Sequence, residues 1–456
     1  MLKNLTNLLM IFVVTCIVFL FLSFFVVEAF IDEPMHVNSN RKLEIESTTG
    51  NLTEGVLCKS MKNTEQTILA KEFKSQITQF RKVTPKHKLN KLSNFCKTDE
   101  DFVSMITGTK IICSEKVDQL CQEFLDYKIK YGSSEEIKLY TAMDVEAFKY
   151  RLISKRPLAF FGATEDPAKL RSGAPKYNEI QQYITLDERL ISTFLGVSFP
   201  THFVNSGSRY NEGVKAKSGT FISAGTYVGL VGARFETHEN ESRFLTKAGQ
   251  IREAAKGKEW MRIWENFYGI ADFSSDHNKF FNGRYDLSVF NKHLQQKLLP
   301  LLDEHKTDPS DMRPAYMHIV GLGTGAWAPV NMEAQIEHMI YESLVGHIAN
   351  GDFSNVAVLD FSWFPSLADL ISSKEYVQDV NGHKIILLCT KNDPASLTPL
   401  KEGKRLVATF AWDGNSYPGN EYFCGMLTAS GDPAAACCST IVDQFVARFG
   451  RALHLQ

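Results

Sequence analysis

Apolar residues recur at intervals of three and four along the first third of the chain after its N-terminal segment. Val117, Leu120, Cys121 and Phe124 are one such series. This is the spacing of positions that lie on one face of an α-helix. The sequence therefore predicts a helical section over residues 65–155.

The pattern changes after Arg156-Pro157, where short apolar runs are separated by Gly, Asn and Asp. The runs are LAFFGA, GTYVGLVGARFE, AYMHIVGLGTGAW, VAVLDFSWF, IILLCT and RLVATFAWDGN. Several are continuously apolar, as strands covered on both faces must be. The stretch from Met332 to Ile348 between two of them has helical spacing. Residues 156–456 are therefore predicted to form an α/β domain with a mixed, largely parallel sheet flanked by helices.

The N-terminus predicts a membrane-directed segment. Residues 8–27 contain no charge and are long enough to cross the hydrocarbon core of a bilayer. Residues 1–29 fit either a cleaved signal peptide or a retained anchor, and the polar residues 30–64 fit a linker. We expect an exported or membrane-anchored protein that contacts the membrane through this segment only.

The composition of the chain excludes some classes of protein. The 456 residues are 44% hydrophobic and the formal net charge is −2, which indicates a globular chain that does not bind nucleic acid through a basic surface. Eight of the nine cysteines lie beyond the apolar run, which is compatible with disulfides or with buried thiols. No paired CxxC motif is present, and His318, His338 and His347 lack metal-ligand spacing, so we expect no metal site.

Three glycines follow a predicted strand at Ala315–Val320. Gly321, Gly323 and Gly325 allow a tight turn and let backbone N–H groups approach a ligand. Asn331 is expected to cap the helix that follows, and a helix N-terminus above such a loop suits a phosphate or diphosphate. The GxGxGx spacing differs from the dinucleotide fingerprint GxGxxG, and a tight turn without a ligand is the alternative.

Trp327 lies inside the same loop and is placed either to stack on a sugar or base or to anchor the loop in the core. Asp360 ends the apolar run that begins at Val356, where a carboxylate is expected to open onto the crevice of an α/β sheet. Asp369 follows in the same segment and is expected to reach that crevice. Asp352 precedes the strand and is interpreted as a turn residue.

A second polar cluster follows the run Leu406–Phe410. It contains Trp412, Asp413, Asn415, Tyr417, Asn420, Glu421 and Tyr422. Amides can hold ribose hydroxyls and carboxylates can move a proton, so we expect ligand contact here, with a plain surface loop as the alternative. A third stretch joins Asn205, Arg209, Tyr210 and Asn211 to Arg234 and Glu236, which form either a local ion pair or the border of the cleft.

The motifs GTYVGLVGARFE, GLGTGAWAP and WDGNSYPGNEY together resemble a divergent, rearranged macrodomain family, that of the Legionella effector MavL. The resemblance covers roughly residues 180–445 and reverses the usual order of the two ligand loops. It implies a fold related to poly(ADP-ribose) glycohydrolases that binds ADP-ribose and removes it from arginine, on ubiquitin in the case of MavL. The chain lacks the GGG motif with paired glutamates, which argues against cleavage of poly-chains.

The residues assigned to the site follow from the motifs and the resemblance. The predicted catalytic residues are Asp360, Asp369, Asp413 and Glu421, and the predicted ligand-binding residues are Gly321, Gly323, Thr324, Gly325, Ala326, Trp327, Trp412, Asn415, Tyr417 and Asn420. The expected reaction is hydrolysis of an ADP-ribosyl–arginine bond without a cofactor, on a modified protein such as ubiquitin. By resemblance the protein would be a secreted effector acting in a host cell. A non-catalytic ADP-ribose reader and an S-adenosylmethionine-dependent transferase are the alternatives.

Overall fold

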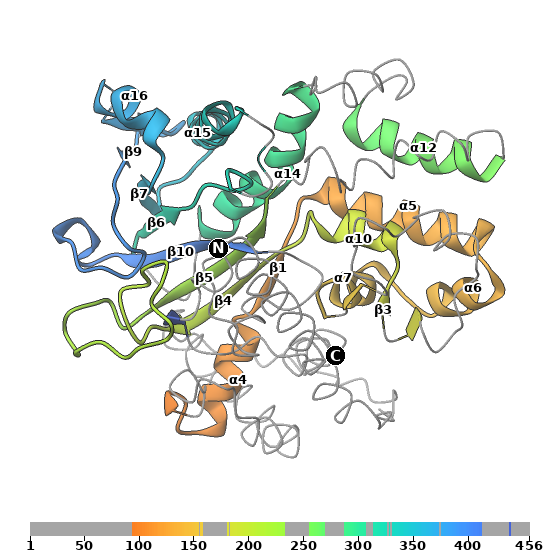
Figure 1. The fold of residues 1–456 in the computed structure, drawn as a ribbon, viewed down its shortest axis with the longest axis horizontal. Helices are drawn as coiled ribbons and strands as arrows, with labels where there is room; N and C mark the ends of the chain where they lie inside the picture. Colours follow the sequence, from red (N-terminus) through yellow and green to blue (C-terminus); the bar gives the residue numbers. More distant parts are fainter. Residues whose placement is uncertain are drawn as a thin grey trace, which may run out of the picture. The chain divides into compact units, whose positions relative to one another are not determined.

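We describe the protein from a computed structural model (Figure 1). The described residues are 94–154, 156–157, 180–181, 183–232, 255–269, 287–306, 313–325, 328, 331–373, 375–412 and 437–438. They all belong to one compact unit, Glu65–Gln456. The predicted membrane segment at residues 8–27 and the linker at 30–64 lie outside the described residues. Among the helices that are described, none is long and apolar enough to span a bilayer.

Eight of the described strands form one sheet. In spatial order they are β1 (Lys110–Ile112), β4 (Gly196–His202), β5 (Ala224–Val231), β10 (Arg405–Trp412), β6 (Ala315–Ile319), β7 (Val356–Phe361), β9 (Lys384–Leu388) and β8 (Tyr376–Gln378). The five strands from β5 to β9 in this order run parallel to their neighbours, and the pairs at both margins are antiparallel. The predicted mixed, largely parallel sheet is confirmed.

Helices precede the sheet in the chain and also lie between its strands. They are α4 (Asp99–Thr107), α5 (Glu115–Tyr131), α6 (Ser134–Thr141), α7 (Val145–Ser154), α10 (Leu186–Ser192), α12 (Ala255–Tyr268), α14 (Leu287–Lys306), α15 (Glu333–Ala349) and α16 (Ala368–Ser373). Two 3₁₀ turns, η4 (Pro365–Leu367) and η5 (Pro399–Lys401), and a small sheet of β2 (Arg156–Pro157) and β3 (Tyr183–Ile184) complete the described elements. Within the section predicted to be helical, α4, α5, α6 and α7 occupy most of residues 99–154, and β1 pairs with β4.

Each face of the sheet packs against its own hydrophobic core. Tyr316 of β6 belongs to one core, together with Phe124 of α5 and Trp264 of α12. Its neighbour Met317 points to the opposite face and packs in a second core with Ile340 of α15. In Figure 1, α14 and α15 lie together on one side of the strands, apart from the group formed by α5, α6, α7 and α10. The central strands are continuously apolar because both of their faces are covered.

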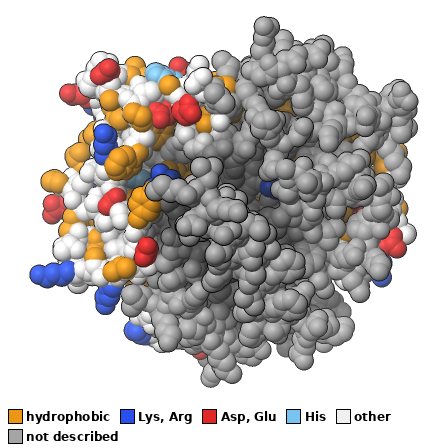
Figure 2. Space-filling view, in the orientation of Figure 1, with side chains coloured by type: hydrophobic (Ala, Val, Ile, Leu, Met, Phe, Trp, Pro, Cys, Tyr) orange, Lys and Arg blue, Asp and Glu red, His pale blue; other side chains and the backbone are white. Residues whose placement is uncertain are grey.

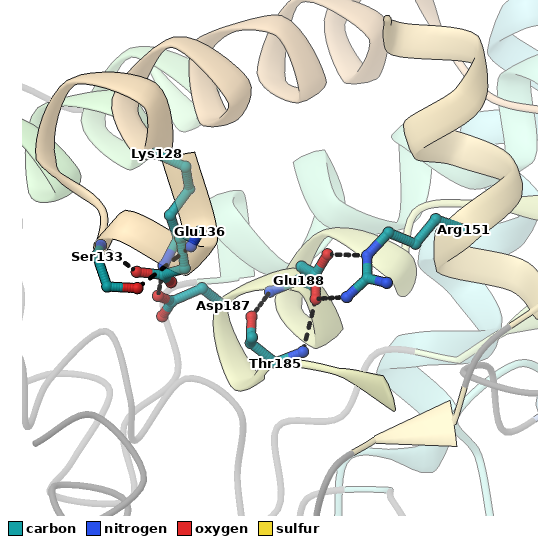
Figure 3. A network of polar contacts seen from close by, with 7 residues as sticks. All are labelled: Lys128, Ser133, Glu136, Arg151, Thr185, Asp187 and Glu188. Carbon is teal, nitrogen blue, oxygen red and sulfur yellow. Dashed lines mark hydrogen bonds and ion pairs between the residues drawn. The ribbon is translucent and has the colours of Figure 1, made fainter. Parts of the chain in front are cut away.

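Two groups of buried charges join the front helices (Figure 3). Lys128 of α5 donates from Nζ to Glu136 Oε1 of α6 at 2.8 Å and to Asp187 Oδ2 of α10 at 2.9 Å. Arg151 of α7 binds Glu188 of α10 through two parallel hydrogen bonds, Nε to Oε1 at 2.6 Å and Nη2 to Oε2 at 3.0 Å. Each buried charge therefore contacts an opposite charge.

The two glutamates also fix the starts of their helices. The Glu136 N–H donates to Ser133 Oγ at 3.2 Å, and Glu136 Oε2 accepts from the Ser133 N–H at 2.9 Å. Thr185 and Glu188 repeat this capping box at α10, where the return bond to the Thr185 N–H is 2.6 Å. Helix initiation and helix packing thus depend on the same carboxylates.

The start of α15 differs from the sequence prediction. Met332 is its N-cap and makes no side-chain cap hydrogen bond, while Asn331 has a φ of 62°. The expected cap at Asn331 is wrong, because the left-handed backbone places this residue in the preceding turn. The first N–H groups of α15 therefore lack a side-chain acceptor at the N-cap.

The described cysteines Cys96, Cys113, Cys121, Cys389, Cys437 and Cys438 are all free thiols. Four of them, namely Cys96, Cys121, Cys437 and Cys438, are buried, as expected for thiols that pack as small hydrophobes. Cys58 and Cys424 lie outside the described residues. Asp352 accepts a hydrogen bond from the Ser354 N–H at 3.1 Å, which confirms its role in a turn.

Candidate functional site

The five parallel strands β5, β10, β6, β7 and β9 end at the same edge of the sheet. The carboxyl edge of a parallel sheet is where α/β proteins bind ligands, because the strand ends and helix starts there leave polar groups unpaired. The described segments at this edge are the glycine loop after β6 (residues 321–325), the turn after β7 (362–364) and the segment after β9 (389–396).

The glycine loop leaves β6 and contacts the end of β5. Gly323 has a φ of 71°, which confirms that the turn needs a left-handed glycine. A Cβ added to Gly232, just after β5, would lie 2.5 Å from the Gly323 nitrogen, so the two backbones touch. Thr324 Oγ1 closes the turn by donating to the Gly321 carbonyl at 3.2 Å. The loop thus crosses the end of β10, which lies between β6 and β5.

Thr409 of β10 anchors the start of this crossing. Its Oγ1 donates to the His318 carbonyl at 2.9 Å and accepts from the Val320 N–H at 2.9 Å. The backbone register between β10 and β6 stops at Ala408 and His318. One hydroxyl therefore continues the pairing of two strands where their ladder ends, and it fixes the point at which the glycine loop begins.

Asp360 lies on β7, one residue before the strand ends at the carboxyl edge of the sheet. Sequence analysis expected its carboxylate to open onto the crevice, but the side chain is fully buried. Oδ2 accepts from the Tyr316 hydroxyl at 2.6 Å and Oδ1 accepts from Thr390 Oγ1 at 2.8 Å. Burial, followed by the charge and hydrogen bond of Asp360, raises the pKa of Tyr316, so this phenol stays protonated as a donor. The carboxylate is closed off because Thr390 and Tyr316 occupy its two oxygens.

His318 and Ser362 flank Asp360 and bind the segment that follows β9. The His318 ring pairs through Nε2 with the Asn392 carbonyl at 3.2 Å, and Ser362 Oγ donates to the same carbonyl at 2.8 Å. Burial lowers the pKa of His318 although Asp360 opposes this, which favours the neutral imidazole. Its Nδ1 is buried and has no hydrogen-bond partner within the described structure.

Lys401 of η5 completes the group. Its Nζ donates to the carbonyls of Pro394 at 2.8 Å, Ser396 at 3.1 Å and Asp393 at 3.3 Å. It also lies 5.1 Å from the centre of the Tyr316 ring. Burial lowers the pKa of Lys401 to about 8, although Asp360 and Asp393 raise it. We call Tyr316, His318, Asp360, Ser362, Thr390 and Lys401 the edge cluster.

Most of the edge cluster was missed by sequence analysis. Tyr316 and His318 are two residues apart on β6 and therefore lie on the same face of the sheet, and His318 pairs in register with Asp360. The two-residue period of the strand was the signal that could have identified them. Thr390 and Lys401 come from later segments that carry no motif. Trp363, two residues after the end of β7, was also missed; it is 61% exposed and has a φ of 63°.

The other predicted site residues are placed as follows. Asp369 is exposed in the first turn of α16, and no described contact joins it to Asp360. Trp412 ends β10, but its side chain is outside the description, as are Ala326, Trp327, Asp413, Asn415, Tyr417, Asn420 and Glu421. In the third polar stretch, Arg234 and Glu236 are likewise outside the described residues.

Asn205 and Asn211 stabilise their own loop. Asn205 donates from Nδ2 to Asn211 Oδ1 at 3.1 Å, and the two side chains accept from the N–H groups of Gly207 and Gly213. His347 pairs with Asp303 between α15 and α14 at 3.0 Å, as a helix-surface histidine would. Within the described part of the chain, no group of three His, Cys, Asp or Glu side chains is arranged to hold a metal ion.

Acidic, basic and hydrophobic side chains are interspersed over the described part of the face in Figure 2, and no extended basic patch is visible there. This surface agrees with the near-neutral composition of the chain.

Comparisons with known proteins match most of this chain. A family model described as MavL-like ADP-ribosylhydrolase matches residues 78–449. ADP-ribosylarginine hydrolase CG3568 of Drosophila melanogaster is 31% identical over 383 residues, which cover 73% of this chain and 73% of that protein. ADP-ribosylarginine hydrolase CG2909 of the same insect is 26% identical over 373 residues, which cover 72% of this chain and 74% of that protein.

Proposed function

The chain belongs to the MavL-like ADP-ribosylhydrolase family and is a hydrolase that acts on ADP-ribosyl groups, and we propose that its substrate is a protein carrying ADP-ribose on an arginine side chain. The names of both insect relatives support the arginine linkage. The observation that supports the proposal in this structure is the contact between Gly232 and Gly323, which brings two backbone segments together without a side chain between them. We further propose that the sheet is that of a macrodomain.

In this proposal the glycine loop binds the diphosphate. Gly321, Gly323, Thr324 and Gly325 supply backbone N–H groups, and Gly325 is exposed with open space where a Cβ would be. The N-terminus of α15 adds a partial positive charge, and its N-cap offers no competing side-chain acceptor. Anion binding by backbone groups of this kind needs no lysine or arginine in the loop.

The reaction is hydrolysis of the bond between C1″ of the ribose and the guanidine nitrogen. A water oxygen bonds to C1″ as the C1″–N bond breaks, the bonding electrons go to the nitrogen, and the water proton is transferred through a carboxylate to the leaving arginine. Carboxylates suit this step because they stabilise positive charge on the ribose and accept a proton. We assign the contacting carboxylate to the segment after β10, where Asp413 and Glu421 lie outside the described residues. The step uses no resident cofactor.

Asp360 has a different part in the proposal. Because its side chain is fully buried and already accepts two hydroxyl hydrogen bonds, it is a positioning residue rather than a group that touches the ribose. It holds the ends of β6, β7 and β9 in one arrangement through Tyr316 and Thr390. The glycine loop begins at the end of β6, so its geometry depends on this arrangement.

The modified protein and the location are separate parts of the proposal. Ubiquitin as the modified protein and a secreted bacterial effector follow only from the resemblance, and both relatives reported above come from an insect. We keep export or membrane anchoring through residues 8–27 as a proposal. We therefore test arginine-modified ubiquitin as one of several substrates.

The test measures release of ADP-ribose from an arginine-modified peptide, arginine-modified ubiquitin and a serine-modified peptide. We expect turnover of the arginine-linked substrates only. Calorimetry with ADP-ribose, NAD and S-adenosylmethionine should show tightest binding of ADP-ribose. An enzyme that cleaves only the serine-linked peptide would contradict the arginine assignment.

Gly323→Ala tests the site within the same assay. An L-residue in the left-handed region costs about 1–2 kcal/mol, and relief of this strain changes the backbone of the loop, so we expect ADP-ribose affinity to fall by at least roughly tenfold. Gly382→Ala is the matched control, since Gly382 has a φ of 78° with open space around it and lies in the turn between β8 and β9. Equal affinity in the two variants would exclude the glycine loop as the diphosphate site.

A further inference from the structure

Lys297 is a buried lysine in the middle of α14. Its side chain is 2% exposed, and on the same helix Leu294, Leu298 and Leu301 pack into the apolar core of one sheet face. A lysine at such a position costs free energy, because its ammonium group must leave water. An apolar residue of the same length would serve packing as well. Lys297 therefore has a role beyond filling the core.

The ammonium group contacts the end of β5. Lys297 Nζ donates to the Val231 carbonyl at 2.8 Å and to the Gly232 carbonyl at 3.3 Å. It also lies 5.6 Å from the centre of the Phe194 ring, whose face attracts a cation. Val231 is the last residue of β5, and Gly232 follows it at the carboxyl edge of the sheet. Lys297 thus fixes two successive peptide groups at the point where the chain leaves the sheet.

The same peptide groups contact the glycine loop. A Cβ on Gly232 would lie 2.5 Å from the Gly323 nitrogen and 2.8 Å from its Cα. Through the Gly232 backbone, Lys297 Nζ is within roughly 10 Å of the Gly323 nitrogen. The peptide between Val231 and Gly232 is trans, so the Gly232 N–H points away from the carbonyl that Lys297 binds. The lysine therefore sets the orientation of the backbone against which Gly323 lies.

The helix that carries Lys297 also holds the other part of the proposed diphosphate site. Asn291 of α14 accepts from the Ser343 hydroxyl of α15 at 3.0 Å. Asp303 of α14 pairs with His347 of α15, also at 3.0 Å. The N-terminus of α15 supplies the partial positive charge in the proposal. The spacing between the end of β5 and α15 therefore depends on α14.

We propose that Lys297 is a positioning residue, which holds the end of β5 so that the Gly232 backbone supports the glycine loop in its diphosphate-binding conformation. This inference rests on the proposed function. The ammonium group also compensates the partial negative charge of two carbonyl oxygens beside a site for an anion. Both effects act on binding of the diphosphate, and a buried side chain does not touch the reacting bond.

The test measures the affinity of the full chain for ADP-ribose by calorimetry. Lys297→Met keeps the length of the side chain without its charge, and we expect it to bind ADP-ribose roughly tenfold more weakly. In the assay with the arginine-modified peptide, KM should rise while kcat stays nearly unchanged. Lys297→Gln keeps a donor for one carbonyl and should lose less affinity. It carries the test if Lys297→Met does not fold.

Lys128→Met is the matched control. Lys128 is also a buried lysine, but it binds Glu136 and Asp187 among the front helices. The control variant should have a lowered Tm, and its affinity for ADP-ribose per folded molecule should equal that of the wild type. Any general effect of destabilisation on binding is measured by this variant.

A double variant tests the route of the effect. If Lys297 acts through the contact between Gly232 and Gly323, the losses of Lys297→Met and Gly323→Ala are coupled. The double variant should then lose less affinity than the product of the two single losses. Simple multiplication of the two losses would show that the lysine and the loop act separately, which contradicts the proposal.

Two further results would overturn the inference. If Lys297→Met binds ADP-ribose as tightly as the wild type, or loses no more affinity than Lys128→Met, Lys297 is purely structural, and turnover by the wild type would leave the proposed function intact. If the wild type binds no ADP-ribose and has no activity on modified arginine, the proposed function itself fails and this inference fails with it.

Discussion

The ion-pair network of the front helices and the edge cluster both bury charges, but they compensate them differently. In the front network Arg151 contacts Glu188 through two hydrogen bonds (Figure 3). In the edge cluster Asp360 contacts two neutral hydroxyls, and Lys401 contacts backbone carbonyls. Opposite charges in direct contact hold the helices together. Asp360 and Lys401 instead contact neutral groups, so neither charge is neutralised by a direct partner. Incomplete compensation of this kind is typical of functional sites.

The two lysines show the same contrast. Burial alone would lower the pKa of Lys128, but Asp187 and Glu136 raise it overall. Burial lowers the pKa of Lys401, and the more distant Asp360 and Asp393 do not reverse this. The front network therefore stabilises the charged form of Lys128, whereas the edge cluster destabilises the charged form of Lys401. Three measurements test this difference.

The largest effect is expected from Arg151→Met. It leaves Glu188 buried without its partner, and breaking a buried pair in this way costs about 3–5 kcal/mol. Urea unfolding measures the loss, and kcat/KM per folded molecule should stay at the wild-type value. The double variant Arg151→Met with Glu188→Gln should recover part of the stability, because the uncompensated charge is gone. A loss below about 1 kcal/mol would mean that the pair is not buried as described.

The next effect is a pH dependence of stability due to Lys401. Its pKa is about 8 in the folded protein against a usual value of 10.5, so between these pH values the unfolded chain binds the proton and the native protein does not. Stability should therefore rise as pH increases from 8 to 10.5, by at most about 3 kcal/mol. Lys401→Met should lack this rise when unfolding is measured across the same range. Parallel pH profiles for the two proteins would contradict the lowered pKa.

The smallest effect concerns Asp360 and separates activity from stability. Asp360→Asn keeps the shape but replaces one acceptor with a donor that faces a hydroxyl, which shifts the ends of β6 and β7. We expect kcat/KM to fall roughly 10- to 100-fold, equivalent to about 1.4–2.7 kcal/mol. The matched control is Asp379→Asn, a buried carboxylate that accepts N–H groups of Phe353 and His383 away from this edge. It should lower the Tm without changing kcat/KM; equal activity losses would indicate a purely structural role for both.

Sequence periodicity predicted the central elements well because their burial is regular. The strands at Ala315–Ile319 and Val356–Phe361 and the helix at Glu333–Ala349 lie within one or two residues of their predicted bounds. β1 was missed because three residues between two helices are too few to show a period. The glycine turn was predicted correctly because a left-handed backbone leaves a residue-type signal, which is glycine itself.

The surroundings of the site were harder to predict. Strand position alone placed Asp360 near the edge, but its closure depends on Tyr316 and Thr390, which lie 44 residues before it and 30 residues after it in the chain. No local pattern reports such a contact. Trp363 sits in an apolar run, so its exposure and its positive φ could be seen only in the folded chain.

The contact between Gly232 and Gly323 also constrains how this family can diverge. Gly232 cannot gain a side chain unless the glycine loop withdraws, and Gly323 has the left-handed backbone that favours glycine, so these two positions, 91 residues apart, are constrained at the same contact. A homologue in which either glycine is replaced should show a compensating change in length or composition in the other loop. Covariation of these two segments would then show that the contact between them is kept across species.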